Sequence, residues 1–152
     1  MKKTFIILGV AFGVLIVVGF IGAYLVQVKG SALDKESKAY VDEVTPIILS
    51  RLNKETLFQY ASDDLKNSGS SEEIDRIFNR LGKLGQFKEY KGSSGQARIL
   101  VSKGKRKQIT GLYEAKAEFG SGTATIKITT IRKENGWQIA QFRINTEAQT
   151  NL

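Results

Sequence analysis

One long uncharged segment near the start of the chain restricts the possible folds more than any other feature. Between Lys3 and Lys29 lie 25 residues without a charge, and most of them are Ile, Val, Leu, Phe or Gly. As a helix, with a rise of 1.5 Å per residue, a segment of this length spans roughly 37 Å, whereas the hydrocarbon core of a bilayer measures about 30 Å. The sequence therefore predicts one transmembrane helix.

A cleaved signal peptide is the alternative interpretation of this segment. Signal peptides have apolar regions of about 7–15 residues, so the segment is too long to be typical. The small residues Gly30, Ser31 and Ala32 nevertheless follow it in a weak cleavage pattern, and this leaves cleavage open. A bacterial lipoprotein anchor is excluded because the chain has no cysteine.

Flanking charge predicts the orientation of the anchor. Lys2 and Lys3 precede the segment and Lys29 follows it, so the positive-inside rule favours a cytoplasmic N-terminus. The prediction is a single-pass protein of a bacterial inner membrane with a periplasmic C-terminal domain. We divide the chain into an anchor (1–28), a linker (29–32), an α+β domain (33–146) and a tail (147–152).

The anchor also contains two pairs of small residues with the spacing that lets membrane helices approach closely. The pairs are Gly9 with Gly13 and Gly19 with Ala23, and on a helix all four fall within an arc of roughly 120°. This glycine stripe predicts contact with another transmembrane protein or with a second copy of the chain. Because glycine is common in membrane helices, a chance occurrence is the alternative.

The absence of Cys and His narrows the possible chemistry. Disulfides, thiolate nucleophiles, imidazole bases and the usual zinc sites are all excluded, so we expect no metal, no cofactor and no enzymatic activity. Basic residues cluster in one predicted turn, at Lys103, Lys105, Arg106 and Lys107. No stacking aromatic accompanies them, and we expect no nucleic acid partner.

Three helices are predicted after the linker. The first runs from Leu33 to Leu52, with Pro46 expected to kink or break it around Glu43 to Pro46. The second is predicted over 54–65 with Asn53 as its N-cap, and Lys66 to Gly69 is interpreted as a turn. The third begins at a capping box of Ser70 and Glu73 and ends at Gly85.

From Gln86 onward the pattern alternates as in strands. Short strands are predicted over 87–90 and 97–101, with the glycines of 92–95 as turn residues. A long strand with one buried side follows from Ile109 to Phe119. After a turn at 120–122, a strand with apolar residues at 124, 126 and 128 precedes a hairpin at 134–136, and a β-bulge is predicted near Ala140 in the last strand. The fold class is therefore α+β, with helices on one face of a curved antiparallel sheet.

The order of these elements is similar to that of a known protein family. The similarity rests on the kinked first helix, the short second helix, the third helix ending in Leu81–Gly85, the long strand Ile109–Phe119 and the closing residues Asn135–Ile139. Together they resemble the cone-shaped nuclear-transport-factor-two-like superfamily over Leu33 to Asn145. The resemblance implies little about activity, because this fold hosts enzymes, transport factors and assembly subunits. Within it, the layout of one helix plus a cone is similar to that of bitopic periplasmic subunits of type IV secretion channels.

The resemblance also implies a place for a pocket inside the cone. On the long strand, the residues that would face it are Gly111, Tyr113, Ala115 and Ala117. These small side chains either leave a cavity or let a helix pack closely, and close packing is the favoured interpretation. The leading functional hypothesis is a non-enzymatic accessory or assembly module that binds a protein partner of a membrane complex. A small-molecule binder that uses the cone interior is the alternative, followed by an enzyme.

Overall fold

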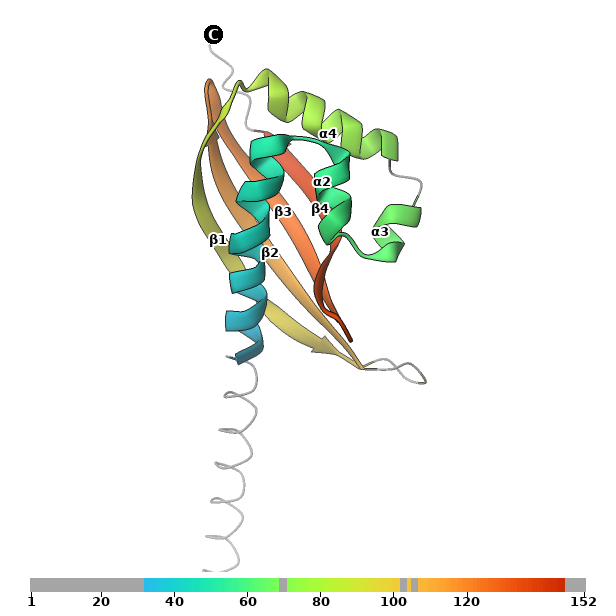
Figure 1. Ribbon diagram of the computed structural model, residues 1–152. Helices are drawn as coiled ribbons and strands as arrows, with labels where there is room; N and C mark the ends of the chain where they lie inside the picture. Colours follow the sequence, from blue (N-terminus) through green and yellow to red (C-terminus); the bar gives the residue numbers. More distant parts are fainter. Residues whose placement is uncertain (1–31, 69–70, 102–103, 105–106, 147–152) are drawn as a thin grey trace, which may run out of the picture. The chain divides into compact units, whose positions relative to one another are not determined.

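The computed structural model describes residues 32–68, 71–101, 104 and 107–146. Helices come first in the chain and lie on one face of a four-stranded antiparallel sheet (Figure 1). This confirms the predicted α+β class, with helices followed by a curved antiparallel sheet. No helix among these described residues is long and apolar enough to cross a membrane. The predicted anchor at 1–28, the glycine stripe and the tail at 147–152 all lie outside the described residues.

In the described part of the chain, four helices precede the sheet. The first helix is described over residues 32–51. It is followed by α2 (Lys54–Tyr60), α3 (Asp63–Asn67) and α4 (Ser71–Lys83). The sheet has the order β1 (Phe87–Leu100), β2 (Gln108–Phe119), β3 (Gly122–Lys133) and β4 (Gly136–Thr146).

The strand pattern of the sequence is confirmed in most of the sheet. Along β2 the residues from Gly111 to Phe119 alternate between the core and the outer face. A two-residue hairpin at Glu134 and Asn135 joins β3 to β4, because Lys133 pairs with Gly136. The predicted bulge is present at Ala140, which is skipped where the pairing shifts between Thr129 and Thr130.

Of the kink or break predicted around Glu43 to Pro46, the break is wrong. The helix is uninterrupted through 43–46, although proline removes one backbone donor. Its apolar residues Val41, Val44, Ile48 and Leu49 are almost completely buried in the core. Burial of each large aliphatic side chain contributes about 1.5–3 kcal/mol, which outweighs the loss of a single backbone hydrogen bond.

The second predicted helix is in fact two helices. Its cap is confirmed, since Asn53 Oδ1 accepts a 2.8 Å bond from the Thr56 N–H. The chain leaves the helix at Ala61 and Ser62 because the Ser62 N–H donates to the Ile139 carbonyl at 2.8 Å. The Ser62 hydroxyl then accepts from the Leu65 N–H and caps α3. Lys66 and Asn67 accordingly belong to α3 and not to the predicted turn.

The end of α4 matches its prediction. Gly85 has φ +89°, a conformation that glycine adopts without strain, and it ends the helical region. A Cβ at this position would lie 3.3 Å from the Cα of Gly120, so this connection packs against the β2–β3 turn. The start of α4 is described from Ser71, and the predicted cap Ser70 lies outside the described residues.

The glycine-rich residues 92–95 do not form a turn, which corrects that prediction. They belong to β1, one strand of 14 residues in place of the two short ones predicted. The pairing with β2 shifts between Phe87 and Glu89 and again between Tyr90 and Gly92. These irregularities let a long strand bend along the curved sheet, and alternation in the sequence is lost there.

Trp137 does not belong to the central core, which contains Phe78 and Phe142. Those two rings do meet, with centroids 6.1 Å apart. Trp137 is half-buried near the β3–β4 hairpin, where the Arg132 guanidinium lies 5.7 Å from its ring centroid. Arg132 also pairs with Glu36 of the first helix.

Candidate functional site

The structure brings the four predicted cone residues onto one face of β2. Gly111, Tyr113, Ala115 and Ala117 are all buried on the side of the sheet that carries the helices. Of the predicted basic turn only Lys107 is described, and it is exposed.

Two glycines accommodate the ring of Tyr113. A Cβ added at Gly111 would lie 2.7 Å from Tyr113 Cε2 and 2.5 Å from Thr130 Oγ1. A Cβ added at Gly95, which pairs with Tyr113 across β1 and β2, would lie 2.7 Å from Tyr113 Cδ1. Contacts this short leave no room for a side chain. The small residues on this face therefore make space for the protein's own phenol ring.

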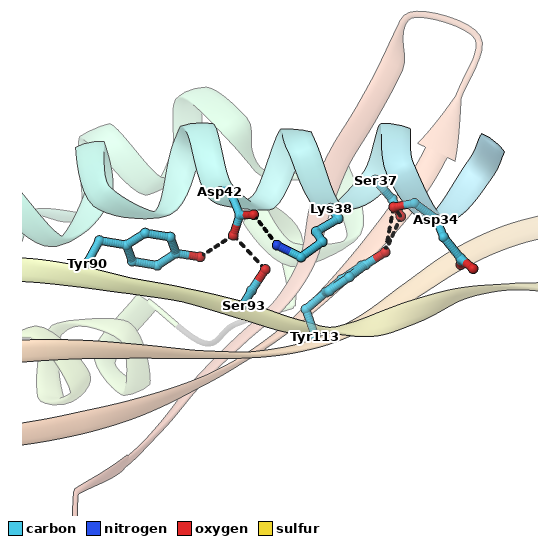
Figure 2. A network of polar contacts seen from close by, with 7 residues as sticks. All are labelled: Asp34, Ser37, Lys38, Asp42, Tyr90, Ser93 and Tyr113. Atoms are coloured by element: carbon cyan, nitrogen blue, oxygen red, sulfur yellow. Dashed lines mark hydrogen bonds and ion pairs between the residues drawn. The ribbon is translucent and has the colours of Figure 1, made fainter. Parts of the chain in front are cut away.

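The Tyr113 hydroxyl is bonded to the first helix (Figure 2). It shares a hydrogen bond with the buried Ser37 hydroxyl and donates to the Asp34 carbonyl at 3.3 Å. Burial raises the pKa of Tyr113, and the nearby Asp34 carboxylate adds to the increase. The phenol thus keeps its proton at neutral pH and acts as a hydrogen-bonding group.

Asp42 is the centre of a second set of contacts between the first helix and β1. Its Oδ1 accepts from the Tyr90 hydroxyl at 2.8 Å and from the Ser93 hydroxyl at 2.6 Å. Its Oδ2 pairs with Lys38, one turn earlier in the helix, and Figure 2 shows these groups converging. Partial burial alone would raise the pKa of Asp42, but the bonds from Lys38, Ser93 and Tyr90 lower it below the ordinary value. Burial and the bond to Asp42 raise the pKa of Tyr90.

Asp34 makes a further contact with β1, near the N-terminal end of the first helix. Its Oδ1 accepts a 2.6 Å bond from the Ala97 N–H, a backbone donor of β1. We call Asp34, Ser37, Lys38, Asp42, Tyr90, Ser93 and Tyr113 the helix clamp. Sequence reasoning did not identify it. The usable signal was the spacing of Asp34, Lys38 and Asp42, which places three polar side chains on one face of a helix.

The helix clamp is suited to holding structure in place. Both oxygens of Asp42 are occupied by donors, and the carboxyl is ionised at neutral pH, so it has no proton to donate. A general acid or base needs a pKa near the working pH and access to a substrate. Within the described part of the chain, no group of three or more Asp and Glu side chains is placed to hold a metal ion.

The outer surface offers a hollow that the sequence analysis also missed. A cavity of about 360 Å³ between α4 and β4 is lined by Arg76, Arg80 and Arg143 together with Glu73. The Arg76 guanidinium forms an ion pair with Glu72, with 3.7 Å between Nη2 and Oε2. Arg76 and Arg80 are one turn apart beside the apolar stripe of α4, and this spacing was the available signal. The lining carries more positive than negative charge, which suits an acidic group on a partner.

Comparison with protein-family models, curated proteins and solved structures found no match to this chain. The resemblance to the nuclear-transport-factor-two-like superfamily therefore stays a prediction.

Proposed function

We propose that this chain is a single-pass, membrane-anchored accessory or assembly module without enzymatic activity. Its anchor would be the uncharged segment within 1–28, inserted with the N-terminus in the cytoplasm of a bacterium. Its α+β domain would lie in the periplasm and bind a protein partner of a membrane complex. The glycine stripe would provide contact with a partner helix in the bilayer.

The observation that carries this proposal is the filled inner face of the sheet. Tyr113, Ala115 and Ala117 are at most 4% exposed, and the glycines beside Tyr113 leave no space around its ring. The polar groups that border this face bond to one another in the helix clamp. A domain whose interior is occupied in this way binds through its surface, which favours a protein partner over a small molecule in the cone.

The helix clamp also supports a role in positioning. The described first helix starts by residue 32, only four residues after the predicted anchor ends. Hydrogen bonds at Asp34 and Asp42 then attach this helix to β1 over two turns. A helix attached to the sheet in this way keeps a fixed position within the domain, as expected for a subunit that presents a rigid surface to a partner.

The glycine stripe provides the experiment. In lipid, helix association depends on close backbone approach, so bulky residues on the stripe should prevent it. Gly13→Leu combined with Gly19→Leu should reduce the amount of partner that copurifies in mild detergent at least fivefold, with insertion unchanged. The matched control is Val10→Leu with Val17→Leu, which should retain the partner. Equal retention by the two double variants would contradict docking through the anchor.

A further inference from the structure

The end of the β1–β2 hairpin exposes an unusual amount of apolar surface. Four large apolar side chains are exposed in the part of the chain that the structure describes, and three of them are consecutive. Ile99 is 42% exposed, Leu100 52% and Val101 75%. Single exposed apolar residues are ordinary, whereas a contiguous group marks an interaction surface. We call these three residues the apolar tip.

Strand geometry shows what kind of surface can cover the apolar tip. Successive side chains of a strand point to opposite faces of the sheet. Ile99, paired with Ile109, lies on the helix-bearing face, and Leu100, paired with Gln108, lies on the outer face. A protein partner that packs on one face of the sheet would leave the other face exposed. A medium that surrounds the end of the hairpin, such as the interfacial region of a bilayer, covers both.

The helix clamp determines which end of the domain the chain enters. Asp34 contacts Ala97, while Asp42, two turns later, contacts Tyr90 and Ser93. The first helix therefore runs antiparallel to β1, and its N-terminal end lies at the same end of the sheet as the apolar tip. Figure 1 shows the start of the helix and the end of β1 at this common end.

Chain length would bring this end close to the membrane of the proposed anchor. Asp34 follows Val28, the last residue of the proposed anchor, by six positions. Six residues span at most about 20 Å when extended and about 9 Å when helical. From Ala97, which is level with Asp34, β1 continues to Leu100 and Val101 follows it, about 13 Å from Ala97 at the usual rise of a strand. The apolar tip can therefore reach the bilayer surface from which the chain emerges.

We propose that the apolar tip inserts into the interface of the membrane that carries the anchor, as a second point of lipid contact. This inference rests on the proposed membrane anchor. It adds a role for the apolar tip, because two contacts with the membrane restrict the tilt of the domain more than a single anchor does. Lys107, exposed just before β2, lies in the sequence next to further basic residues, and this charge favours anionic lipid headgroups.

The absence of cysteine makes the test specific, because each introduced cysteine is the only labelling site. Full-length Leu100→Cys and Val101→Cys are labelled with a nitrobenzoxadiazole fluorophore and reconstituted at low protein density in phosphatidylcholine and phosphatidylglycerol vesicles. Nitroxide groups on the lipids quench the fluorophore only where it meets lipid. Lys83→Cys is the control, because it is exposed at the end of α4 beside the β2–β3 turn. This turn lies at the opposite end of the sheet, about 35–40 Å away along β2.

Quenching at residues 100 and 101 should exceed quenching at residue 83 by at least twofold, with blue-shifted emission at the apolar tip. Emission typical of water at residues 100 and 101 would overturn the proposal. A blue shift without quenching would also overturn it, since it would indicate a protein contact with a second copy. A labelled Val17→Cys in the same vesicles reports on the anchor. If residue 17 is quenched and residue 100 is not, only the tip proposal fails, whereas an unquenched residue 17 contradicts the anchor.

Discussion

Removal of the Asp42 carboxylate tests whether the helix clamp holds the first helix on the sheet. Asp42 accepts hydrogen bonds from Tyr90 and Ser93 and pairs with Lys38. A hydrogen bond to a charged group contributes about 1.5–3 kcal/mol when buried, and an exposed ion pair about 0–1 kcal/mol. Because the Asp42 side chain is 31% exposed, the low end of the range applies. Asp42→Ala removes two such bonds and should therefore cost about 3 kcal/mol of unfolding free energy.

The assay is urea unfolding of the full chain in detergent, followed by the emission of its single tryptophan. Tyr90→Phe should cost about 1.5 kcal/mol alone and much less in the background of Asp42→Ala, because the two changes remove the same hydrogen bond. Glu114→Ala, on the outer face of β2, is the control and should change stability by less than about 0.5 kcal/mol. If Asp42→Ala lowers the free energy of unfolding no more than Glu114→Ala does, the helix clamp has no stabilising role. Additive effects of Asp42→Ala and Tyr90→Phe would also refute that role.

The same carboxylate predicts a dependence on pH. In the folded protein the bonds from Lys38, Ser93 and Tyr90 hold the pKa of Asp42 below the ordinary value of an aspartate. Because folding lowers this pKa, the carboxylate adds its full stability at any pH above the pKa that Asp42 has in the unfolded chain. This stability is lost as the pH falls through the pKa that Asp42 has in the folded protein. The advantage of the native chain over Asp42→Asn should therefore decrease only below about pH 4. A difference that decreases between pH 7 and pH 5 would contradict this assignment.

Further predictions concern the core, the glycines and the topology. Phe78→Ala should cost about 3–5 kcal/mol because the ring is buried against Phe142, and a loss below about 1 kcal/mol in the same urea assay would contradict this packing. Gly95→Ala should cost about 3 kcal/mol or more, since its Cβ would lie 2.0 Å from a backbone oxygen, while Gly82→Ala, with nothing within 4 Å, should stabilise α4 by about 0.5–1 kcal/mol. Equal unfolding midpoints for the two glycine variants would refute the close packing at Gly95. A reporter that is active only after export, fused after Leu152, should be active, and an inactive fusion would reverse the topology.

The sequence predicted those parts of the fold that depend on local patterns. Three local predictions were correct: the alternation along β2, the hairpin at 134–136 and the bulge near Ala140. Errors arose where tertiary contacts override local preference. Packing of the first helix compensates for Pro46, and a bond from Ser62 to Ile139 divides the second helix.

The candidate site was less predictable because it depends on contacts between distant residues. Asp42 bonds to Ser93, which lies 51 positions later in the chain. The serines and glycines of 92–95 were interpreted as a turn, so no contact with the first helix was expected there. Tyr113 was singled out on β2, and in the structure its ring lies close to Gly95 and Gly111. Which helix would meet its hydroxyl could not be read from spacing, because the register between the first helix and the sheet is set by side-chain contacts formed on folding.

The most direct test of the proposed function is the state of the mature chain in its membrane. Membranes from cells that express the native sequence are washed at alkaline pH, and the intact mass of the protein in the pellet is measured. We expect the full chain of 16.8 kDa, including residues 1–28, to remain in the pellet. A shorter protein that begins near Leu33, or release of the chain into the wash, would contradict a membrane-anchored module.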